Sequence, residues 1–322
     1  MLIDKSVENE LALTKLVKFI CDQEKFYSIN VDISKIKDVQ NIQEFKKYFE
    51  SINVKIEESE LINDLYNTIE ESNEYIDAII YLAKINCNEA IKTLAIMYAD
   101  GYGIEKNLKE AVRLFTLAAE QGDVDSQFNL ALMYKDGEGV EKNLEEAVRL
   151  YTLAADQGDA DAQFNLALMY YNGEGVEQNL EEAVRLFTLA AEQGDPSAQF
   201  NLGLMYHYGE GGCQDYTEAI KWYELASEQF HNDASLNLGW MYENGYGVEQ
   251  NYDEAKEYYL LAAMQGNTLA NYNLGILYEE GKIKCENDND QLKEAEFWYN
   301  EAFSKGYAPA KDKLEELKKE KI

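Results

Sequence analysis

Proline is nearly absent from this sequence, with two residues in 322. Because proline breaks or kinks helices, its scarcity favours a nearly continuous series of helices. Long apolar runs are also missing, and without a run of about 18 apolar residues no membrane-spanning helix is expected. The opening residues, MLIDKSVENELALTKLVKF, contain acidic residues early and no apolar core of signal-peptide length, which favours a cytoplasmic location.

Cysteine is scarce as well, and the four residues are Cys21, Cys87, Cys213 and Cys285. They share no common spacing and form no CxxC pair, so neither a disulfide framework nor a zinc site is expected. Reduced thiols in a cytoplasmic protein fit this pattern best.

Positive charge is outnumbered two to one, because 29 Lys and Arg residues face 61 Asp and Glu residues, for a net charge of −32. A nucleic-acid-binding protein needs positive charge to displace counterions, so this class is disfavoured. An anionic membrane surface is disfavoured for the same reason. Two explanations of the acidity stay open, namely partners with basic segments and simple solubility.

A block of 36 residues recurs down most of the chain. A tyrosine and, three positions later, a glycine mark each copy: Tyr98 and Gly101, Tyr134 and Gly137, Tyr170 and Gly173, Tyr206 and Gly209, Tyr242 and Gly245, Tyr278 and Gly281. A fixed period of this size predicts a solenoid in which each unit packs only on its neighbours. Such folds present long surfaces, so the pattern favours a binding scaffold.

Each block predicts two helices joined by a glycine turn, as residues 159–194 illustrate. Asp159 is placed to cap the first helix, helix A, and Gly173 to end it with a positive φ. Asn179 begins the second helix, helix B. Because Glu182 follows three residues later, the pair predicts a capping box with Asn in place of Ser or Thr.

At these positions the sequence resembles the Sel-one-like repeat (SLR) family, a branch of the tetratricopeptide-type helical repeats. The element A-x-x-x-L-[GA]-x-x-Y-x-x-G-x-G-V reads AQFNLALMYYNGEGV at 162–176 and ASLNLGWMYENGYGV at 234–248. A second element reads AVRLFTLAAEQG at 183–194. The resemblance implies an all-α fold, a right-handed superhelical α-solenoid of TPR-like helix-turn-helix repeats.

Four segments are expected along the chain. Residues 1–58 match nothing periodic and are interpreted as a mostly helical N-terminal cap or a small separate domain, with short strands conceivable in YSINVDIS and INVKI. Residues 59–87 are interpreted as a degenerate repeat. Residues 88–306 hold six repeats, the last with a four-residue insertion. Residues 307–322 are expected to form a capping helix that covers the last apolar face.

The fourth repeat departs from the pattern at three positions. Gly212 and Cys213 stand where the preceding repeat has Val and Glu, so its turn loses an apolar anchor. Phe230 replaces the glycine expected after helix B.

Catalytic chemistry is not indicated. His207 and His231 are the only histidines, no further ligand motif accompanies them, and they are interpreted as isolated surface substitutions. The GxG turns lie between helices and lack the lysine of a phosphate-binding loop, so turn formation explains them. We therefore expect no enzyme activity, no cofactor and no metal site.

An asparagine recurs within helix A of successive repeats, where it is a mediocre helix former: Asn129, Asn165, Asn201, Asn237 and Asn273. Related solenoids hold extended peptides with such ladders, because an amide donates to and accepts from a peptide backbone. The resemblance therefore makes these residues candidate peptide-binding residues on the concave face. Two alternatives stay open, in which each asparagine bonds the neighbouring repeat or is merely copied by duplication.

The function that follows from the resemblance is a non-catalytic protein-interaction scaffold or adaptor, in contexts such as protein quality control or host–pathogen signalling. The expected partner is a protein or extended peptide with basic segments, with neither nucleic acid nor membrane involved. A structural spacer or self-assembling element is an alternative. A β-lactam-binding relative is a distant one, because the paired cysteines of such secreted relatives are missing here. The oligomeric state is left open.

Paired alanines in helix B, such as Ala154–Ala155 and Ala190–Ala191, allow neighbouring helices to approach closely. Replacement of Ala155 or Ala191 by leucine should overpack this contact and lower the free energy of unfolding by about 1–3 kcal/mol. Urea unfolding followed by circular dichroism measures the loss. An unchanged midpoint for both variants would show that the contact has room to spare.

Overall fold

The computed structural model describes residues 5–22, 36, 39, 41–51, 56–69, 76–284 and 288–320. Seventeen helices and no strand lie in these residues, which confirms the expected all-α fold. The chain divides into two compact units, residues 1–157 and 158–322. The segment YSINVDIS and most of INVKI, where strands were conceivable, lie outside the described residues.

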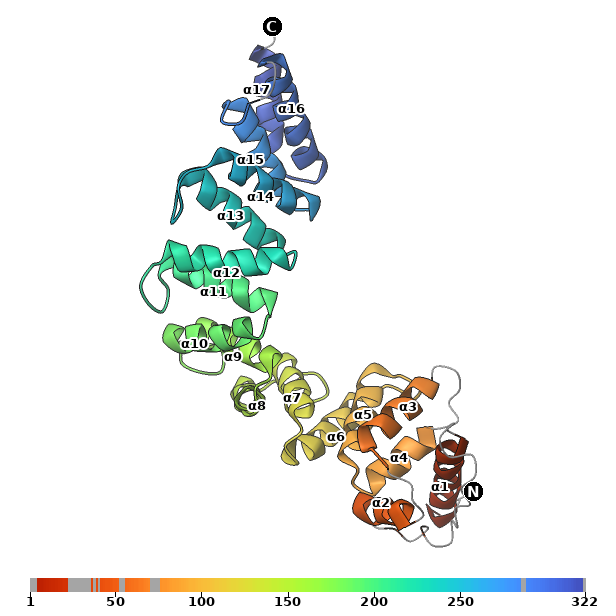
Figure 1. The fold of residues 1–322 in the computed structure, drawn as a ribbon. Coiled ribbons are helices and arrows are strands. Elements are labelled where there is room, and N and C mark those ends of the chain that lie inside the picture. Colours follow the sequence, from red (N-terminus) through yellow and green to blue (C-terminus); the bar gives the residue numbers. More distant parts are fainter. Residues whose placement is uncertain are drawn as a thin grey trace. The chain divides into compact units, whose positions relative to one another are not determined.

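The first unit contains eight helices within its described residues (Figure 1). Helix α1 packs against α4, α3 packs against both α4 and α5, and two regular pairs, α5/α6 and α7/α8, follow. The bounds are α1 (Lys5–Asp22), α2 (Ile42–Ser51), α3 (Glu58–Ile69), α4 (Ile76–Lys84), α5 (Asn88–Asp100), α6 (Leu108–Glu120), α7 (Val124–Asp136) and α8 (Leu144–Asp156).

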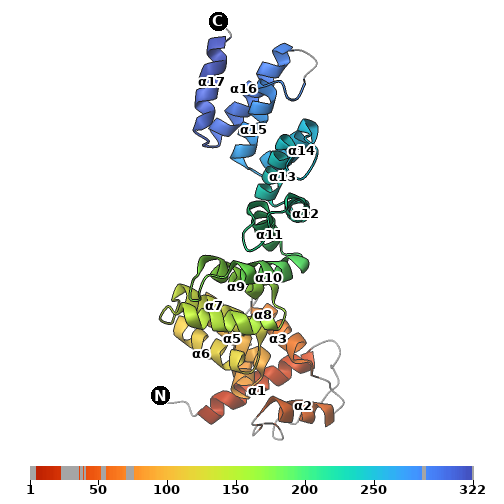
Figure 2. The same cartoon turned by 90° about the vertical axis from the view of Figure 1, so that its left-hand side faces the viewer.

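The second unit contains four helix pairs and a final single helix, each packed on its neighbours in the chain (Figure 1, Figure 2). In each pair the first member is helix A and the second is helix B. The bounds are α9 (Ala160–Asn172), α10 (Leu180–Glu192), α11 (Pro196–Tyr208), α12 (Tyr216–Glu228), α13 (Asn232–Asn244), α14 (Tyr252–Met264), α15 (Thr268–Glu279), α16 (Asp288–Ser304) and α17 (Pro309–Glu320).

The helix ends form largely as the sequence predicts. The Asp159 carboxylate accepts the Ala162 N–H at the start of α9, and Gly173 ends that helix with φ 72°. The Asn179 side chain accepts the Glu182 N–H at the start of α10. Each contact satisfies a backbone group that a helix end would otherwise leave without a partner.

The predicted capping box is wrong in its second contact, the one from the Asn179 backbone N–H to the Glu182 carboxylate. The backbone N–H of Asn179, which a capping-box carboxylate would accept, donates instead to the Tyr170 carbonyl at 2.9 Å. The Glu182 carboxylate turns outward and pairs with Arg185 at 2.6 Å. The marker tyrosine of helix A thus supplies its carbonyl to close the turn, and the glutamate is left for a surface ion pair.

In the later repeats a buried tyrosine ring of helix B lies on a glycine of the helix A before it. A Cβ built on Gly203 would lie 2.6 Å from the Tyr223 ring, and one built on Gly239 would lie 2.5 Å from the Tyr259 ring. Real Cβ contacts are essentially never this short, so glycine is required for the rings to lie where they do. Ala155 and Ala191 are buried, as the close helix approach predicts.

Two residues other than glycine adopt the left-handed backbone conformation, both at the position where the repeat has glycine after helix B. Phe230 has φ 64° and Asn86 has φ 63°, whereas Gly194 at the same repeat position has φ 96°. Asn86 lies just after α4, and Cys87 then donates its N–H to the Leu82 carbonyl. On the basis of this turn, we propose that residues 59–87 form a degenerate repeat.

The loss of an apolar anchor in the fourth turn leaves a cavity of about 150 Å³ in the second unit. It is lined by Val184, Met205, Tyr206, Glu210, Gly211, Gly212 and Cys213. A Cβ on Gly212 would meet no atom within 4 Å. In the next repeat Val248 fills the matching position and packs on the core. The cavity is therefore the space that a valine side chain occupies elsewhere in the array.

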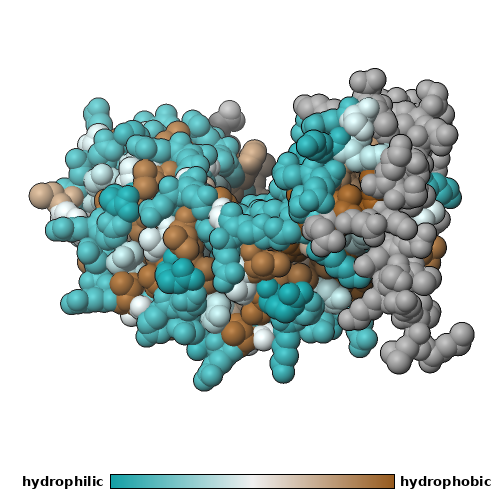
Figure 3. Space-filling model, turned by 90° about the horizontal axis from the view of Figure 1, so that it is seen from below, coloured by the Kyte–Doolittle hydropathy of each residue, from teal (hydrophilic) through white to brown (hydrophobic). Residues whose placement is uncertain are grey.

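The acidic composition is reflected on the surface. On the face shown in Figure 3, the described residues are mostly hydrophilic, and apolar side chains occur in groups separated by polar ones. A surface of this kind favours solubility and resists nonspecific association.

Replacement of Phe230 by glycine should raise the free energy of unfolding by about 1 kcal/mol, because a side chain in the left-handed region costs about 1–2 kcal/mol and glycine does not bear that cost. The Phe230 side chain is 75% exposed, so little packing is lost. Thermal unfolding measures the gain. Gly194→Ala, at the same position one repeat earlier, is the matched control and should lower the midpoint. A lower midpoint for Phe230→Gly would contradict this account.

Candidate protein-binding surface

The five asparagines of the predicted ladder lie on the helix A members of their repeats, and all are partly exposed. Asn129 lies on α7 in the first unit, whereas the other four lie on α9, α11, α13 and α15 in the second. Their side chains do not all make the same contacts, so the ladder divides into two groups.

The first group bonds to its own helix. The side-chain amide N–H of Asn129 donates to the Asp125 carbonyl at 2.7 Å, and that of Asn201 donates to the Ser197 carbonyl at 2.8 Å. Asn165 makes the same type of bond to Asp161 at 2.9 Å. A side chain that bonds to the carbonyl four residues earlier contributes little to the packing of one repeat on the next.

The second group lies near tyrosines of the preceding repeat. Asn237 opposes the rise in the pKa that burial causes in Tyr223, and Asn273 does the same for Tyr259, so each asparagine lies near a hydroxyl on the helix B fourteen residues earlier. The rings at the matching positions before Asn129 and Asn201 are Phe115 and Phe187, which have no hydroxyl.

We propose the stacking interpretation for Asn237 and Asn273, because a buried hydroxyl favours a polar neighbour. It does not account for Asn129 and Asn201.

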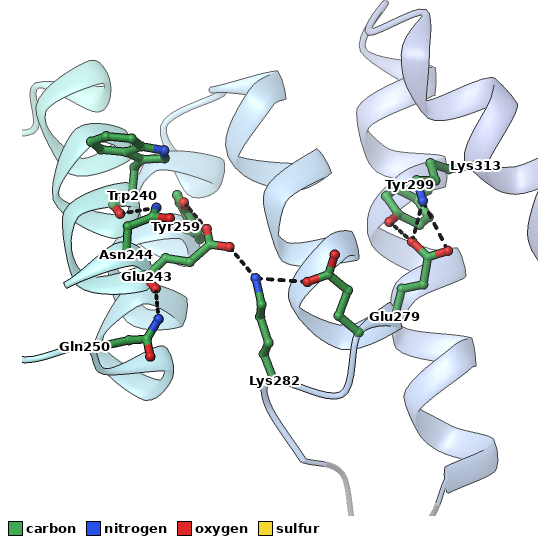
Figure 4. A network of polar contacts seen from close by, with 10 residues as sticks. Trp240, Glu243, Asn244, Gln250, Tyr259, Glu279, Lys282, Tyr299 and Lys313 are labelled. Carbon is green, nitrogen blue, oxygen red and sulfur yellow. Dashed lines mark hydrogen bonds and ion pairs between the residues drawn. The ribbon is translucent and has the colours of Figure 1, made fainter. Parts of the chain in front are cut away.

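Near the end of the chain, glutamate side chains on helix A accept hydrogen bonds from the buried tyrosine hydroxyls of helix B (Figure 4). The Tyr259 hydroxyl donates to Glu243 Oε2 at 2.7 Å, and Lys282 Nζ lies 2.9 Å from Glu243 Oε1. Lys282 also pairs with Glu280 at 2.9 Å. Burial raises the pKa of Tyr259, and the nearby Glu243 carboxylate raises it further. The phenol is therefore protonated and donates its hydrogen bond to the carboxylate.

One repeat later the arrangement recurs (Figure 4). The Tyr299 hydroxyl donates to Glu279 Oε2 at 2.5 Å, and Lys313 of the final helix lies 3.1 Å from the same oxygen. Lys313 thus ties α17 to α15, which is consistent with a cap on the last repeat. In both networks a lysine pairs with the glutamate that accepts the tyrosine hydroxyl.

A row of stacked aromatic rings, the aromatic row, lies between the fourth and fifth repeats. It consists of Tyr208, His207, Trp240 and Tyr246. The His207 ring stacks on Tyr208 with centroids 4.6 Å apart and on Trp240 at 5.3 Å. The Trp240 ring stacks in turn on Tyr246 at 4.8 Å. Burial lowers the pKa of His207, so its ring is neutral at pH 7.

The interpretation of the two histidines as surface substitutions is wrong for His207. His207 is buried, and its Nδ1 lies 3.4 Å from the Tyr223 hydroxyl. His231 caps α13, where Nδ1 accepts the Ala234 N–H, and its ring stacks on Phe200. Cys213 is exposed. In the part of the chain that the structure describes, no three His, Cys, Asp or Glu side chains are grouped to hold a metal ion.

Departures from the repeat pattern mark the aromatic row in the sequence. His207, Trp240 and Tyr246 each break the repeat, because the matching residues one repeat earlier are Tyr171, Leu204 and Glu210. The repeats are otherwise nearly identical, and each of these three substitutions introduces or keeps an aromatic ring.

Replacement of Asn237 by alanine should lower the free energy of unfolding by about 1 kcal/mol, because the buried Tyr223 hydroxyl loses a partner. Asn201→Ala is the matched control and should stay within about 0.5 kcal/mol of wild type, since its bond lies within one helix. Chemical denaturation of both variants measures the difference. Equal losses would show that both groups of asparagines hold the stack together.

Comparison with known proteins is consistent with this architecture. The family model described as Sel1 repeat matches six times, at residues 89–123, 124–159, 160–195, 196–229, 232–267 and 268–307. No curated protein matches the sequence. No described helix has both the length and the apolar character required to cross a membrane.

The solved structures that are similar to the chain include two repeat proteins of known source. Protein c5321, described as a protective antigen present in uropathogenic Escherichia coli strains and displaying an SLR fold, is 27% identical, with a TM-score of 0.73 over 94% of this chain. The chain spans 66% of that protein. A Sel1 repeat protein from Oxalobacter formigenes is 30% identical, with a TM-score of 0.62 over 76% of this chain and 99% of its own.

The repeat matches cover most of the chain, and their boundaries coincide with the helix pairs from α5 to α16. This protein therefore belongs to the Sel1 repeat family, whose members generally serve as scaffolds for protein interactions.

Proposed function

We propose that this protein is a non-catalytic scaffold that binds an extended segment of a partner protein along its helix A residues. The observation that carries the proposal is the split of the asparagine ladder. Asn237 and Asn273 lie near tyrosine hydroxyls of the preceding repeat, whereas Asn129 and Asn201 recur at the same position with no tyrosine hydroxyl to bind. Binding explains why an amide is kept there in place of a better helix former.

The chemistry of the amide suits a peptide backbone. An asparagine side chain has two N–H donors and a carbonyl with two lone pairs. The bond from Asn129 to the Asp125 carbonyl, or from Asn201 to the Ser197 carbonyl, uses one donor. The carbonyl oxygen then faces away from that bond and can accept a backbone N–H of an extended peptide. Because both side chains are partly exposed, a peptide can approach them.

The charge of the chain favours a basic partner. The net charge is −32, and the exposed carboxylates of Asp161 and Asp233 lie one helical turn before Asn165 and Asn237. A segment rich in lysine or arginine would meet complementary charge on approach, which raises the association rate and disfavours acidic competitors. Protein quality control and host–pathogen signalling are settings in which such a scaffold would operate.

The double variant Asn129→Ala/Asn201→Ala should remain folded yet lose capture of specific proteins from a lysate of the source cells by tenfold or more. Each substitution removes an exposed amide without breaking a contact between repeats. Quantitative mass spectrometry of proteins retained on immobilised wild type and variant measures the loss.

The matched control is Thr116→Ala/Thr188→Ala. Both threonine hydroxyls donate to the carbonyl four residues earlier, as the asparagines do, but on helix B. This control should retain the partners. Capture that is unchanged in the asparagine variant, or lost equally in the threonine control, would contradict binding along helix A.

A further inference from the structure

The aromatic row is exposed at both ends. Tyr208 is 64% exposed, Trp240 is 37% exposed and Tyr246 is 38% exposed, whereas His207 is buried beneath them. Tyr208 ends α11, Trp240 lies near the end of α13, and Tyr246 lies in the turn that follows α13. Trp240 lies one turn before Glu243 on α13 (Figure 4). Large aromatic side chains on a soluble, acidic surface are costly to hydrate, so their grouping indicates a contact site.

The repeat fold does not require these rings. At the position of Trp240 the preceding repeat has Leu204, and at that of Tyr246 it has Glu210. At the position of Tyr208 the third repeat has Asn172. Since those repeats form the same helix pair with aliphatic, acidic and amide side chains, the aromatic row is an addition to the fold.

The charge around the row selects the type of partner. Residues 196–252, which contain the whole row, carry eight Asp and Glu residues and one lysine. That lysine, Lys221, lies 3.1 Å from Glu218 and is therefore already paired. The Glu249 side chain is exposed three residues after Tyr246. Aromatic faces in such surroundings attract cations, because the ring quadrupole and the carboxylates both favour positive charge.

The same unit already uses this interaction internally. Lys282 Nζ lies 5.4 Å from the centroid of the Tyr252 ring, within the carboxylate network of Glu243 and Glu280. A cation over an aromatic ring flanked by carboxylates is thus an arrangement that this chain forms.

We propose that the aromatic row binds arginine side chains of a partner protein segment, with the guanidinium plane stacked on Tyr208 or Tyr246. The inference rests on the proposed function and adds the residue type that is recognised. Arginine is favoured over lysine because its planar, weakly hydrated guanidinium stacks on an aromatic face, whereas an ammonium is compact and strongly hydrated. The exposed carboxylates provide the second half of the recognition through charge-assisted hydrogen bonds.

The test uses three fluorescently labelled peptides of the same length, each with four residues of arginine, lysine or citrulline spaced by glycine and serine. Fluorescence anisotropy against the full chain at about 0.1 M salt measures binding, under conditions in which exposed charges more than about 10 Å apart are screened. The arginine peptide should bind severalfold more tightly than the lysine peptide. The neutral citrulline peptide should not bind measurably.

The decisive variant is Tyr208→Asn/Trp240→Leu/Tyr246→Glu, because each new residue already occupies that position in another repeat. Its Kd for the arginine peptide should rise at least tenfold. The variant adds a negative charge, so attraction by net charge alone would tighten binding. Phe297→Leu/Phe303→Leu is the control, since it removes two exposed rings of the same unit outside the row, and its Kd should equal that of wild type.

An unchanged or lower Kd in the triple variant would overturn the inference, as would equal binding of the arginine and lysine peptides. Circular dichroism and thermal unfolding establish that the triple variant is folded. If it is not, the single variant Tyr208→Asn, at the most exposed ring, provides the same comparison and should raise the Kd about threefold.

Failure of the wild type to bind the arginine peptide would overturn the inference about the row. The lysate comparison of the asparagine and threonine variants decides the proposed function separately, because it makes no use of these peptides.

Discussion

The contact between a helix B tyrosine ring and the helix A glycine beneath it governs the later repeats. The Tyr223 ring lies over Gly203 and the Tyr259 ring over Gly239, so closely that a single added carbon would collide. This contact fixes the distance between the two helices of a pair. The hydroxyls of Tyr223 and Tyr259 then lie beside polar atoms of their own helix A, His207 Nδ1 and Glu243 Oε2. The glycine thus sets the spacing within a repeat, and helix A supplies a polar partner for the buried hydroxyl.

Two asparagines of the ladder lie close to such buried hydroxyls. Asn237, fourteen residues after Tyr223, opposes the rise in the pKa that burial causes in that tyrosine, and Asn273 acts likewise on Tyr259. Where helix B has a phenylalanine, as at Phe187, the asparagine turns to its own backbone and its amide stays accessible. The type of ring does not decide the contact alone, because Asn165 follows Tyr151 by fourteen residues and bonds to the Asp161 carbonyl. A ladder that is uniform in sequence thus makes contacts that differ from repeat to repeat.

Much of this architecture could be predicted from the sequence, because caps and glycine turns depend on residues close together in the chain. The Asp159 cap, the Gly173 turn and the exceptional backbone at Phe230 all follow from the repeat register. The polar contacts could not be predicted in the same way. Glu182 has two possible partners near in sequence, and only packing shows that Arg185 is chosen. The aromatic row could not be predicted because its rings come from positions up to 39 residues apart, and spacing alone does not show which of them stack.

One pair of repeat positions, 39 residues apart, shows how such an array acquires new surfaces. In the first instance in the second unit, the Tyr171 hydroxyl donates to Glu210 at 2.9 Å. In the next, His207 and Tyr246 both stack on Trp240. In the third, Glu243 and Lys282 form an ion pair at 2.9 Å. A hydrogen bond, an aromatic stack and a salt bridge thus occupy equivalent places while the helix pairs stay the same. Because each repeat contacts only its neighbours, both members of a pair can change together without disturbing the rest of the chain. The aromatic row is the product of such a paired change, in which the hydrogen bond between Tyr171 and Glu210 is replaced by a buried His207 ring and an exposed Tyr246 ring that both stack on Trp240.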